Sequence, residues 1–188
     1  MLAIDANGLG LGLIDFMTKG QIDPETGDEL PPFGVEGGTA EDTIDLYKKI
    51  KGPGVEENAM YLIKATAPIN TEAYSYAQTQ MSSGKVKFLI DEQAAKTKLM
   101  STKQGQGFNA DQRNDYLRPF VLTSILREQM LNLVEENEGV NIILKQSNKS
   151  IKKDKFSAFV YGLYYIKQEE DKKRKRKKRD ISQMLFFS

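Results

Sequence analysis

Short apolar runs alternate with helical patterns along much of the chain, an order typical of an α/β fold. Residues 2–4 form an apolar run too short for a helix and suited to a buried strand of a parallel sheet. Apolar residues at helical spacing follow this run directly: Leu9, Leu13, Phe16 and Met17. The chain therefore predicts a strand, a turn and a helix within its first seventeen residues.

Asp5 stands where this first strand should end. Asn7 and Gly8 predict a tight turn after it, and Gly10 and Gly12 predict that the chain passes close to other backbone. In open α/β sheets the functional crevice lies at the carboxyl ends of the strands. A carboxylate buried there needs a compensating partner, which a metal ion would supply.

The remaining pattern divides into helices, strands and one long loop. Residues 20–39 are rich in Gly and Pro and read as a functional or mobile loop. Further strands are expected at 58–65, 86–90 and 140–145. Helices are expected at 41–50, from Asn70 or Thr71 to 84, after Asp91, and at 111–138. The loop Gly52-Pro53-Gly54 should end the first of these, and Pro119 should kink or divide the last.

The final predicted helix begins at Asp154 and continues into a charged tail. Its apolar stripe consists of Phe156, Phe159, Val160 and Leu163. A length of 188 residues suits one domain with a core and an extension, so we expect a domain over 1–171 and a basic tail over 172–188. We expect neither a membrane span nor a signal peptide.

The absence of two residue types narrows the chemistry. The chain contains no Cys and no His, which excludes thiolate zinc sites, disulfides and histidine-based catalysis. A metal would have to be bound by carboxylate, carbonyl and water oxygens, which favours Mg²⁺ or Mn²⁺.

Charge is distributed unevenly. Residues 1–140 contain 13 Lys and Arg against 21 Asp and Glu, whereas residues 141–188 contain 14 against 5. The run from Lys172 to Arg179 is wholly cationic. Such runs are usually solvated tails, but they also neutralise DNA phosphates without reading sequence.

The sequence matches neither of two common nucleotide-binding motifs. The glycines after the first strand do not match the dinucleotide fingerprint, because position 13 is Leu and no second strand ending in an acid follows. Gly84-Lys85 does not complete a phosphate-binding loop either, because Val86 follows it and Thr79 stands where the first glycine is needed.

Two aspartates are the strongest candidates for chemistry. Asp5 ends a strand, and Asp154 starts a helix, where a capping role is the simpler alternative. Asp91 also follows a predicted strand, and although capping explains it, we keep it as a reserve metal ligand.

Three segments resemble the nuclease domain of the large terminase subunit of tailed phages. They are IDANGLGLGLIDFM, INTEAYSYAQTQMSSGKVKFLIDEQAAKTKL and KKDKFSAFVYGLYYIKQEED, and the resemblance extends from residue 1 to about 171. It implies a ribonuclease H-like fold whose acidic cluster binds two divalent metals for phosphodiester cleavage. Carried over by motif, Asp5 is the second acid of that cluster and Asp154 the last. The family's first acid lies on a preceding strand, so the chain resembles the C-terminal portion of such a domain, lacking the first strands.

The resulting hypothesis is a metal-dependent endonuclease that cuts concatemeric double-stranded phage DNA during packaging. The resemblance implies the terminase ATPase region, the portal ring and the small terminase subunit as partners, and the host bacterial cytoplasm and the procapsid as its locations. One alternative is a non-catalytic nucleic-acid-binding or assembly protein derived from a truncated terminase; another, disfavoured by the glycine spacing, is a nucleotide-binding domain. The candidate DNA-binding residues are Lys152, Lys153, Lys155, Lys172, Lys173, Arg174, Lys175, Arg176, Lys177, Lys178 and Arg179.

Overall fold

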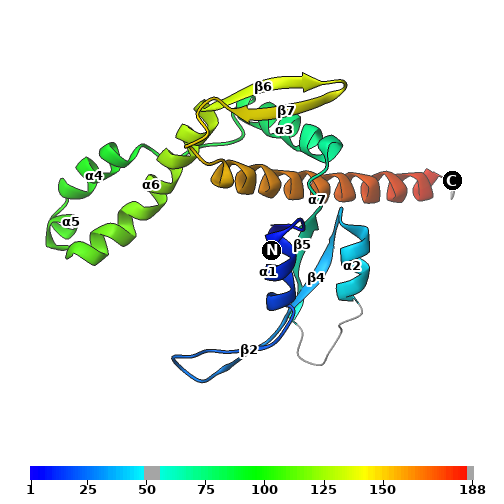
Figure 1. The fold of residues 1–188 in the computed structure, drawn as a ribbon, viewed down its shortest axis with the longest axis horizontal. Coiled ribbons are helices and arrows are strands. Elements are labelled where there is room, and N and C mark those ends of the chain that lie inside the picture. The colour runs from blue at the N-terminus through cyan, green and yellow to red at the C-terminus, as the bar shows by residue number, and fades with distance from the viewer. Residues whose placement is uncertain (49–55, 186–188) are drawn as a thin grey trace. The chain divides into compact units, whose positions relative to one another are not determined.

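The computed structural model describes residues 1–48 and 56–185 and divides into two compact units (Figure 1). Unit 1 comprises Met1–Ala77 and Ala158–Ser188, and unit 2 comprises Gln78–Ser157. Two helices, α3 (Ala67–Ser82) and α7 (Asp154–Leu185), contribute residues to both units. Helices and strands are mixed along the chain, so the predicted α/β class is confirmed.

A three-stranded parallel sheet lies at the centre of unit 1. Its strand order is β1 (Leu2–Asp5), β5 (Glu56–Ile63) and β4 (Phe33–Gly38). Strand β1 pairs in parallel with β5, from Leu2 opposite Met60 to Asp5 opposite Ile63. The predicted first strand and its parallel pairing are confirmed, and β5 confirms the strand expected at 58–65 with both ends two residues earlier.

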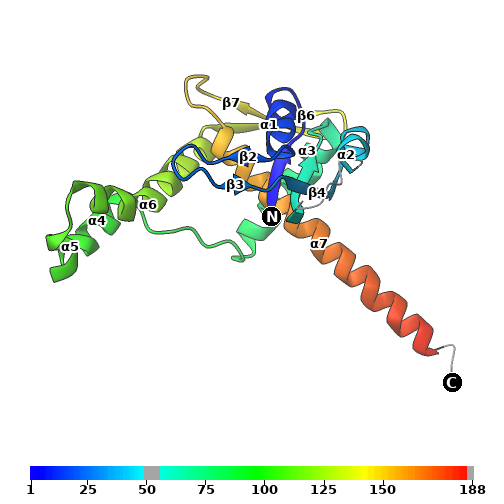
Figure 2. The same ribbon diagram turned by 90° about the horizontal axis from the view of Figure 1, so that it is seen from below.

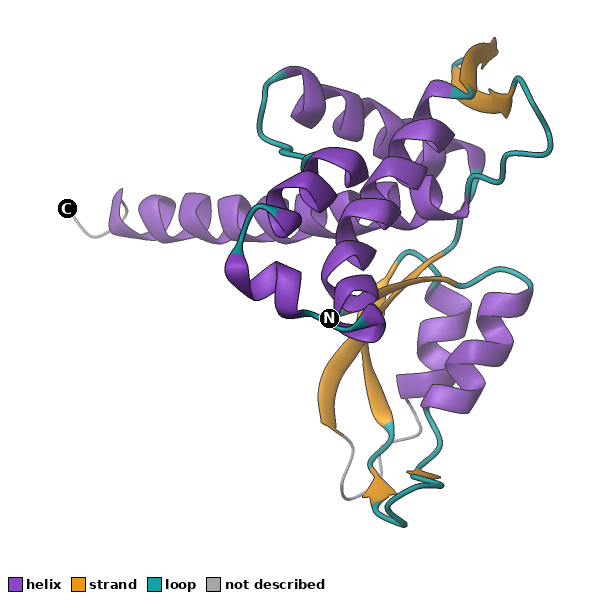
Figure 3. Cartoon of the chain, turned by 90° about the vertical axis from the view of Figure 1, so that its left-hand side faces the viewer, coloured by secondary structure: helices purple, strands orange, loops and turns teal. Residues whose placement is uncertain are grey.

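Helices α1 (Leu9–Met17) and α2 (Glu41–Lys48) lie beside the same face of this sheet (Figure 3). They close a core that buries apolar side chains from all three strands and both helices. The core residues are Ile4, Ala6, Ile14, Val35, Ala40, Ile44, Tyr47, Met60 and Leu62. Side chains on β5 alternate, so Tyr61 leaves this core and contacts Tyr165 of α7, with ring centroids 5.1 Å apart.

The buried face of α1 differs from the predicted one. Ile14 is fully buried and Met17 packs against the core, whereas Leu9, Leu13 and Phe16 are 96%, 50% and 57% exposed. Apolar residues occur on all sides of this short helix, so the spacing of its residues alone could not identify which side is buried. The helix is confirmed, but three of the four apolar residues whose spacing predicted it face solvent.

Residues 20–39 are more ordered than the predicted loop. They contain an antiparallel hairpin of β2 (Gln21–Ile22) and β3 (Glu29–Leu30), labelled in Figure 2, followed by the sheet strand β4. The prediction failed because β4 has the sequence FGVEGG, in which only Phe33 and Val35 give a strand signal. Its pairing with β5 also contains register shifts, which a regular alternation would not.

Unit 2 contains three further helices and a hairpin. Helices α4 (Glu92–Met100), α5 (Lys103–Gly107) and α6 (Ala110–Leu131) precede the antiparallel pair of β6 (Leu133–Glu138) and β7 (Asn141–Gln146). A capping box at Asn109 and Gln112 starts α6. Strand β7 and helix α4 confirm the predictions, while α5 lies in a segment for which no helix was predicted. Pro119 lies inside the single helix α6 and does not divide it.

The predicted strand at 86–90 is wrong. These described residues form no regular strand, and the Leu89 carbonyl oxygen accepts a hydrogen bond from the Arg127 guanidinium at 2.6 Å. An apolar run becomes a strand only where another strand is available to pair with it, and this requirement is not visible in local sequence. The helix expected at 111–138 also ends early. Its last residues form β6 instead, because β6 forms hydrogen bonds with the apolar strand β7 across a turn at Gly139, whose φ is +61°.

Two further predictions concern the long helices α3 and α7. Helix α3 begins at Ala67, and the Thr71 hydroxyl donates to the Ala67 carbonyl at 2.9 Å, so the expected caps Asn70 and Thr71 already lie within the helix. Helix α7 buries Phe156 and Val160 as predicted and continues without interruption through the basic run. The predicted stop at 52–54 lies outside the described residues.

Candidate functional site

Asp5 lies at the carboxyl end of β1, as predicted. It is half-buried and stands opposite Ile63, the last residue of β5. One carboxylate oxygen, Oδ1, accepts a hydrogen bond from the Asn7 amide at 3.1 Å. No hydrogen bond to its other oxygen, Oδ2, is found among the described residues. Asp5 therefore combines partial burial with an unused acceptor.

The turn after Asp5 depends on two glycines. Gly8 has φ of +53°, in the left-handed region where Gly is favoured. Gly10 packs so closely on the strand end that an added Cβ would overlap the Asp5 carbonyl oxygen. Gly12, by contrast, faces open space, so the close approach predicted for both positions is confirmed only at Gly10.

Tyr161 of α7 belongs to the surroundings of Asp5 in unit 1. It is buried, and its hydroxyl donates to the Asn70 Oδ1 atom of α3 at 3.0 Å. Burial raises the pKa of Tyr161, and the negative charge of Asp5 raises it further. A neutral phenol therefore lies near the carboxylate at the end of β1.

Asp154 is the first residue of α7 and is exposed. It therefore lies in the first turn, where a carboxylate favours the helix dipole, rather than at the cap before it. Asp5 belongs to unit 1 and Asp154 to unit 2, so the metal site that we expect them to share remains a prediction.

The lysines around Asp154 differ from one another. Lys152 is exposed, and Lys155 is half-buried. The Nζ atom of Lys153 lies 3.4 Å from the Leu144 carbonyl oxygen and is also half-buried. Lys153 is thus already engaged within unit 2, and Lys152 is the most accessible of the three to an external phosphate.

Asp91 has the capping role that its sequence position allows. Its Oδ1 atom accepts a hydrogen bond from the Ala94 amide at 2.9 Å at the start of α4. It also lines an open hollow of about 490 Å³ in unit 2. The hollow is bounded by Asp91, Ser124, Arg127, Glu128, Leu131, Asn132 and Ile151. Within the part of the chain that the structure describes, no group of three or more acidic side chains is placed to bind a metal.

The basic run is helical as far as it is described. Lys172 and Arg174 form salt bridges within unit 1, whereas Lys173, Lys175 and Arg176 form none with described residues. The side chains of Lys177, Lys178 and Arg179 lie outside those described.

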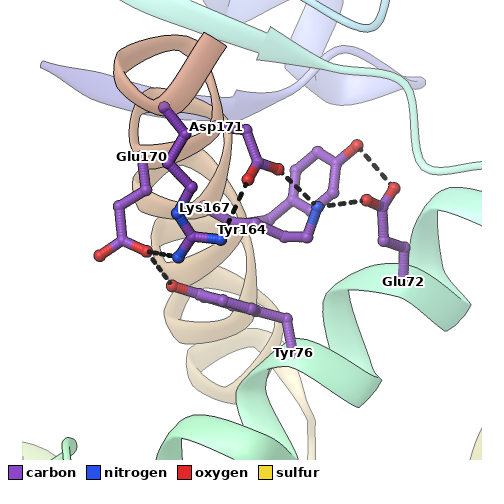
Figure 4. A network of polar contacts seen from close by, with 7 residues as sticks. Glu72, Tyr76, Tyr164, Lys167, Glu170 and Asp171 are labelled. Carbon is purple, nitrogen blue, oxygen red and sulfur yellow. Dashed lines mark hydrogen bonds and ion pairs between the residues drawn. The ribbon is translucent and has the colours of Figure 1, made fainter. Parts of the chain in front are cut away.

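A polar network between α3 and α7 was missed by the sequence interpretation (Figure 4). Lys167 is its centre, with Nζ 2.6 Å from Glu72 Oε1 and 3.0 Å from Asp171 Oδ2. The Tyr164 hydroxyl donates to Glu72 Oε2 at 3.2 Å. A second branch joins Tyr76, Glu170 and Arg174. The spacing of Lys167 and Asp171 was a usable helix-pair signal, but the Glu72 partner is 95 residues away in sequence.

Alkaline pH is expected to destabilise unit 1. Burial raises the pKa of Tyr61 and of Tyr164 to about 12, and each is almost fully buried. In the unfolded chain both phenols ionise near pH 10. Their contribution to stability is therefore complete below about pH 10 and declines as the pH rises toward 12.

Urea unfolding at several pH values tests this expectation. The midpoint should fall steadily above about pH 10. The Tyr61→Phe variant, which lacks one of the titrating phenols, should lose less stability over the same interval. An equal decline in both proteins would show that Tyr61 is not one of the responsible groups.

Comparisons with protein-family models, with curated proteins and with solved structures found no match to this chain. Among the described residues, no helix combines the length and the apolar content needed to cross a membrane.

Proposed function

We propose that this chain is the nuclease part of a phage large terminase, a divalent-metal-dependent endonuclease with a ribonuclease H-like fold. The observation that carries the proposal is Asp5, a half-buried carboxylate with an unused oxygen at the carboxyl end of a parallel strand. The strand, turn and helix around it have the order that the terminase-like motif requires. Cleavage of double-stranded DNA into packaged lengths is the corresponding activity.

The donor set fits a hard cation. Asp5 and Asp154 provide carboxylate oxygens, which Mg²⁺ and Mn²⁺ prefer, and Asp91 remains a reserve ligand because one of its oxygens is used as a cap. When bound, a pair of such ions would supply an activated water and stabilise the leaving oxygen. The chain's own residues would hold the ions and orient the phosphate, with Lys152, Lys153 and Lys155 nearest in sequence to Asp154.

Partners and location follow from the same proposal. A terminase nuclease works beside an ATPase region, with the small terminase subunit and the portal ring, in the host cytoplasm and at the procapsid. The apolar residues Met184, Leu185, Phe186 and Phe187 near the C-terminus are a candidate portal contact. Their side chains lie outside those described.

Plasmid nicking tests the proposed activity. We expect slow nicking of supercoiled plasmid in Mn²⁺, because Asp5 and Asp154 provide two of the carboxylates on which two-metal cleavage depends. The Asp5→Asn variant should show none, because the substitution keeps the size of the side chain and removes the charge. Nicking at an unchanged rate in Asp5→Asn would contradict the role of this residue.

The basic stretch of α7 favours a second candidate function, nucleic-acid binding without cleavage. Exposed cations on a helix neutralise phosphates whether or not a metal site is present. Metal binding separates the candidates, because only the nuclease requires it at Asp5.

Deletion of residues 173–188 is expected to flatten the salt dependence of DNA binding. Each phosphate neutralised contributes about −0.9 to the slope of log affinity against log salt. Deletion of 181–188 alone should leave the slope nearly unchanged, since this segment contains no Lys or Arg. Filter binding of random duplexes at several salt concentrations measures both slopes. Equal slopes for the full chain and both deletions would exclude the basic run as a DNA contact.

A further inference from the structure

The cations of the basic run do not have equal surroundings. Three carboxylates, Glu169, Glu170 and Asp171, immediately precede the run on α7. Helical spacing brings residues three and four positions apart to the same side of a helix. The first turn of the run can therefore be neutralised by its own helix before any external ligand is present.

Lys172 is held from three directions. Its Nζ atom lies 2.6 Å from Glu169 Oε1 and 3.8 Å from Glu36 Oε1 of β4, and it stands 5.8 Å from the ring centroid of Tyr61 on β5. The hydrogen bond to Glu169 raises the pKa of Lys172, which keeps the ammonium charged while it is paired. These contacts connect α7 to two strands of the central sheet.

Arg174 is also paired. Its guanidinium lies 3.6 Å from a carboxylate oxygen of Glu170 and 3.8 Å from one of Asp171. Both carboxylates belong to the network of α3 and α7, in which Figure 4 labels Glu170 and Asp171. Contact with a phosphate at this position would first have to replace two carboxylates.

Lys173, Lys175 and Arg176 are exposed and form no salt bridge with described residues. We propose that duplex DNA is contacted by these three residues, whereas Lys172 fastens α7 to the central sheet and Arg174 is paired along its own helix. This inference rests on the proposed DNA binding and assigns different roles to neighbouring charges. Lys172 is thus a positioning residue, which fixes the part of α7 from which the DNA-contacting stretch begins.

The pattern favours a phosphodiester backbone over a membrane surface. A helix that lies in a bilayer interface has one apolar face to bury. All eight residues from Lys172 to Arg179 are cationic, so this stretch has no such face. Continuous charge around a helix suits contact with phosphates, which carry no side-chain requirement beyond charge.

Two double variants with the same loss of charge test the division of roles. Lys173→Gln with Arg176→Gln should reduce the salt slope of duplex binding by about 1.8, because two phosphate contacts are removed. It should leave the melting temperature unchanged. Lys172→Gln with Arg174→Gln should change the slope little and lower the melting temperature, because its contacts are within the chain.

A third variant tests the role of Lys172 even if the Lys172 and Arg174 double variant does not fold. Glu36→Gln with Glu169→Gln removes the carboxylates that hold Lys172, and it should steepen the slope by up to about 0.9. Equal slope losses in the two double variants would overturn the inference, as would an unchanged slope after release of Lys172.

The same measurements distinguish this inference from the proposal beneath it. If the wild-type chain shows no salt-dependent duplex binding, the proposed DNA contact itself fails. If it binds vesicles containing anionic lipid more tightly than duplex DNA, and the Lys173 and Arg176 variant loses that binding, the exposed cations serve a membrane surface instead. Duplex binding that depends on Lys173 and Arg176 but not on Lys172 and Arg174 supports the inference.

Discussion

Gly10→Ala should lower the stability of the protein by about 2 to 3 kcal/mol, because the new methyl group has no space. Its Cβ would overlap the carbonyl oxygen of Asp5, so the N-terminus of α1 must move away from the end of β1. The Ala side chain also raises helix propensity by about 1 kcal/mol, which offsets part of the loss. Because the displaced carbonyl belongs to the candidate ligand, metal affinity should fall together with stability.

Gly12→Ala is the matched control. Gly12 lies on the same helix and an added Cβ meets no atom within 4 Å, so this variant should gain up to about 1 kcal/mol from helix propensity. Thermal unfolding of both variants gives the comparison, with an expected loss of about 4 to 12 °C for Gly10→Ala. Equal melting temperatures for the two variants would contradict the close approach at Gly10.

Divalent metal should stabilise the wild-type chain strongly. A ligand that binds only the folded state adds about 2.7 kcal/mol at one hundred times its dissociation constant. For a chain of this length that corresponds to about 5 to 10 °C in melting temperature. Asp5→Asn and Asp154→Asn should each abolish most of the Mn²⁺-dependent shift, because each removes a charged ligand.

Asp45→Asn is the control for this series. The Asp45 side chain is exposed on α2 and forms no hydrogen bond or ion pair with described residues, so its variant should keep the full shift. If Asp5 and Asp154 hold the same ions, the double variant should be no worse than either single variant. Additive losses would indicate two separate sites, and a full shift in Asp5→Asn would exclude Asp5 as a ligand.

Local sequence predicted the elements whose signals are local. The run before Asp5 is apolar and short, and the turn residues that follow it leave little alternative to strand, turn and helix. The capping role of Asp91 was likewise readable from its position before a helical pattern. Both predictions rest on interactions between residues close in sequence.

Elements that depend on distant partners were predicted poorly. Strand β4 exists because β5 is available to pair with it, although its own sequence, FGVEGG, has weak strand propensity. Residues 86–90 have the stronger strand pattern, but no strand among the described residues pairs with them. Pairing between distant segments determined whether each of these stretches forms a strand, and a short window of sequence does not reveal such pairing.

At the candidate site, too, local features were predicted and long-range contacts were missed. Asp5 was found because a strand end is a local feature, whereas the contact between Tyr161 and Asn70 joins residues 91 positions apart. The distinction between Lys172 and Lys173 depends on Glu169 and on Glu36, which lies on the distant strand β4. A run of like charges in sequence could not reveal which of its members are already paired.

Iron-mediated cleavage of the protein backbone would test the central claim, that Asp5 and Asp154 bind the same metal. Fe²⁺ bound in place of Mg²⁺, with ascorbate and peroxide, produces radicals that cut the chain near its ligands. We predict cleavage near residue 5 and near residue 154, with both cuts lost in Asp5→Asn and retained in Asp45→Asn. Cleavage near only one of the two aspartates, or cuts near residue 154 that persist in Asp5→Asn, would contradict a shared site.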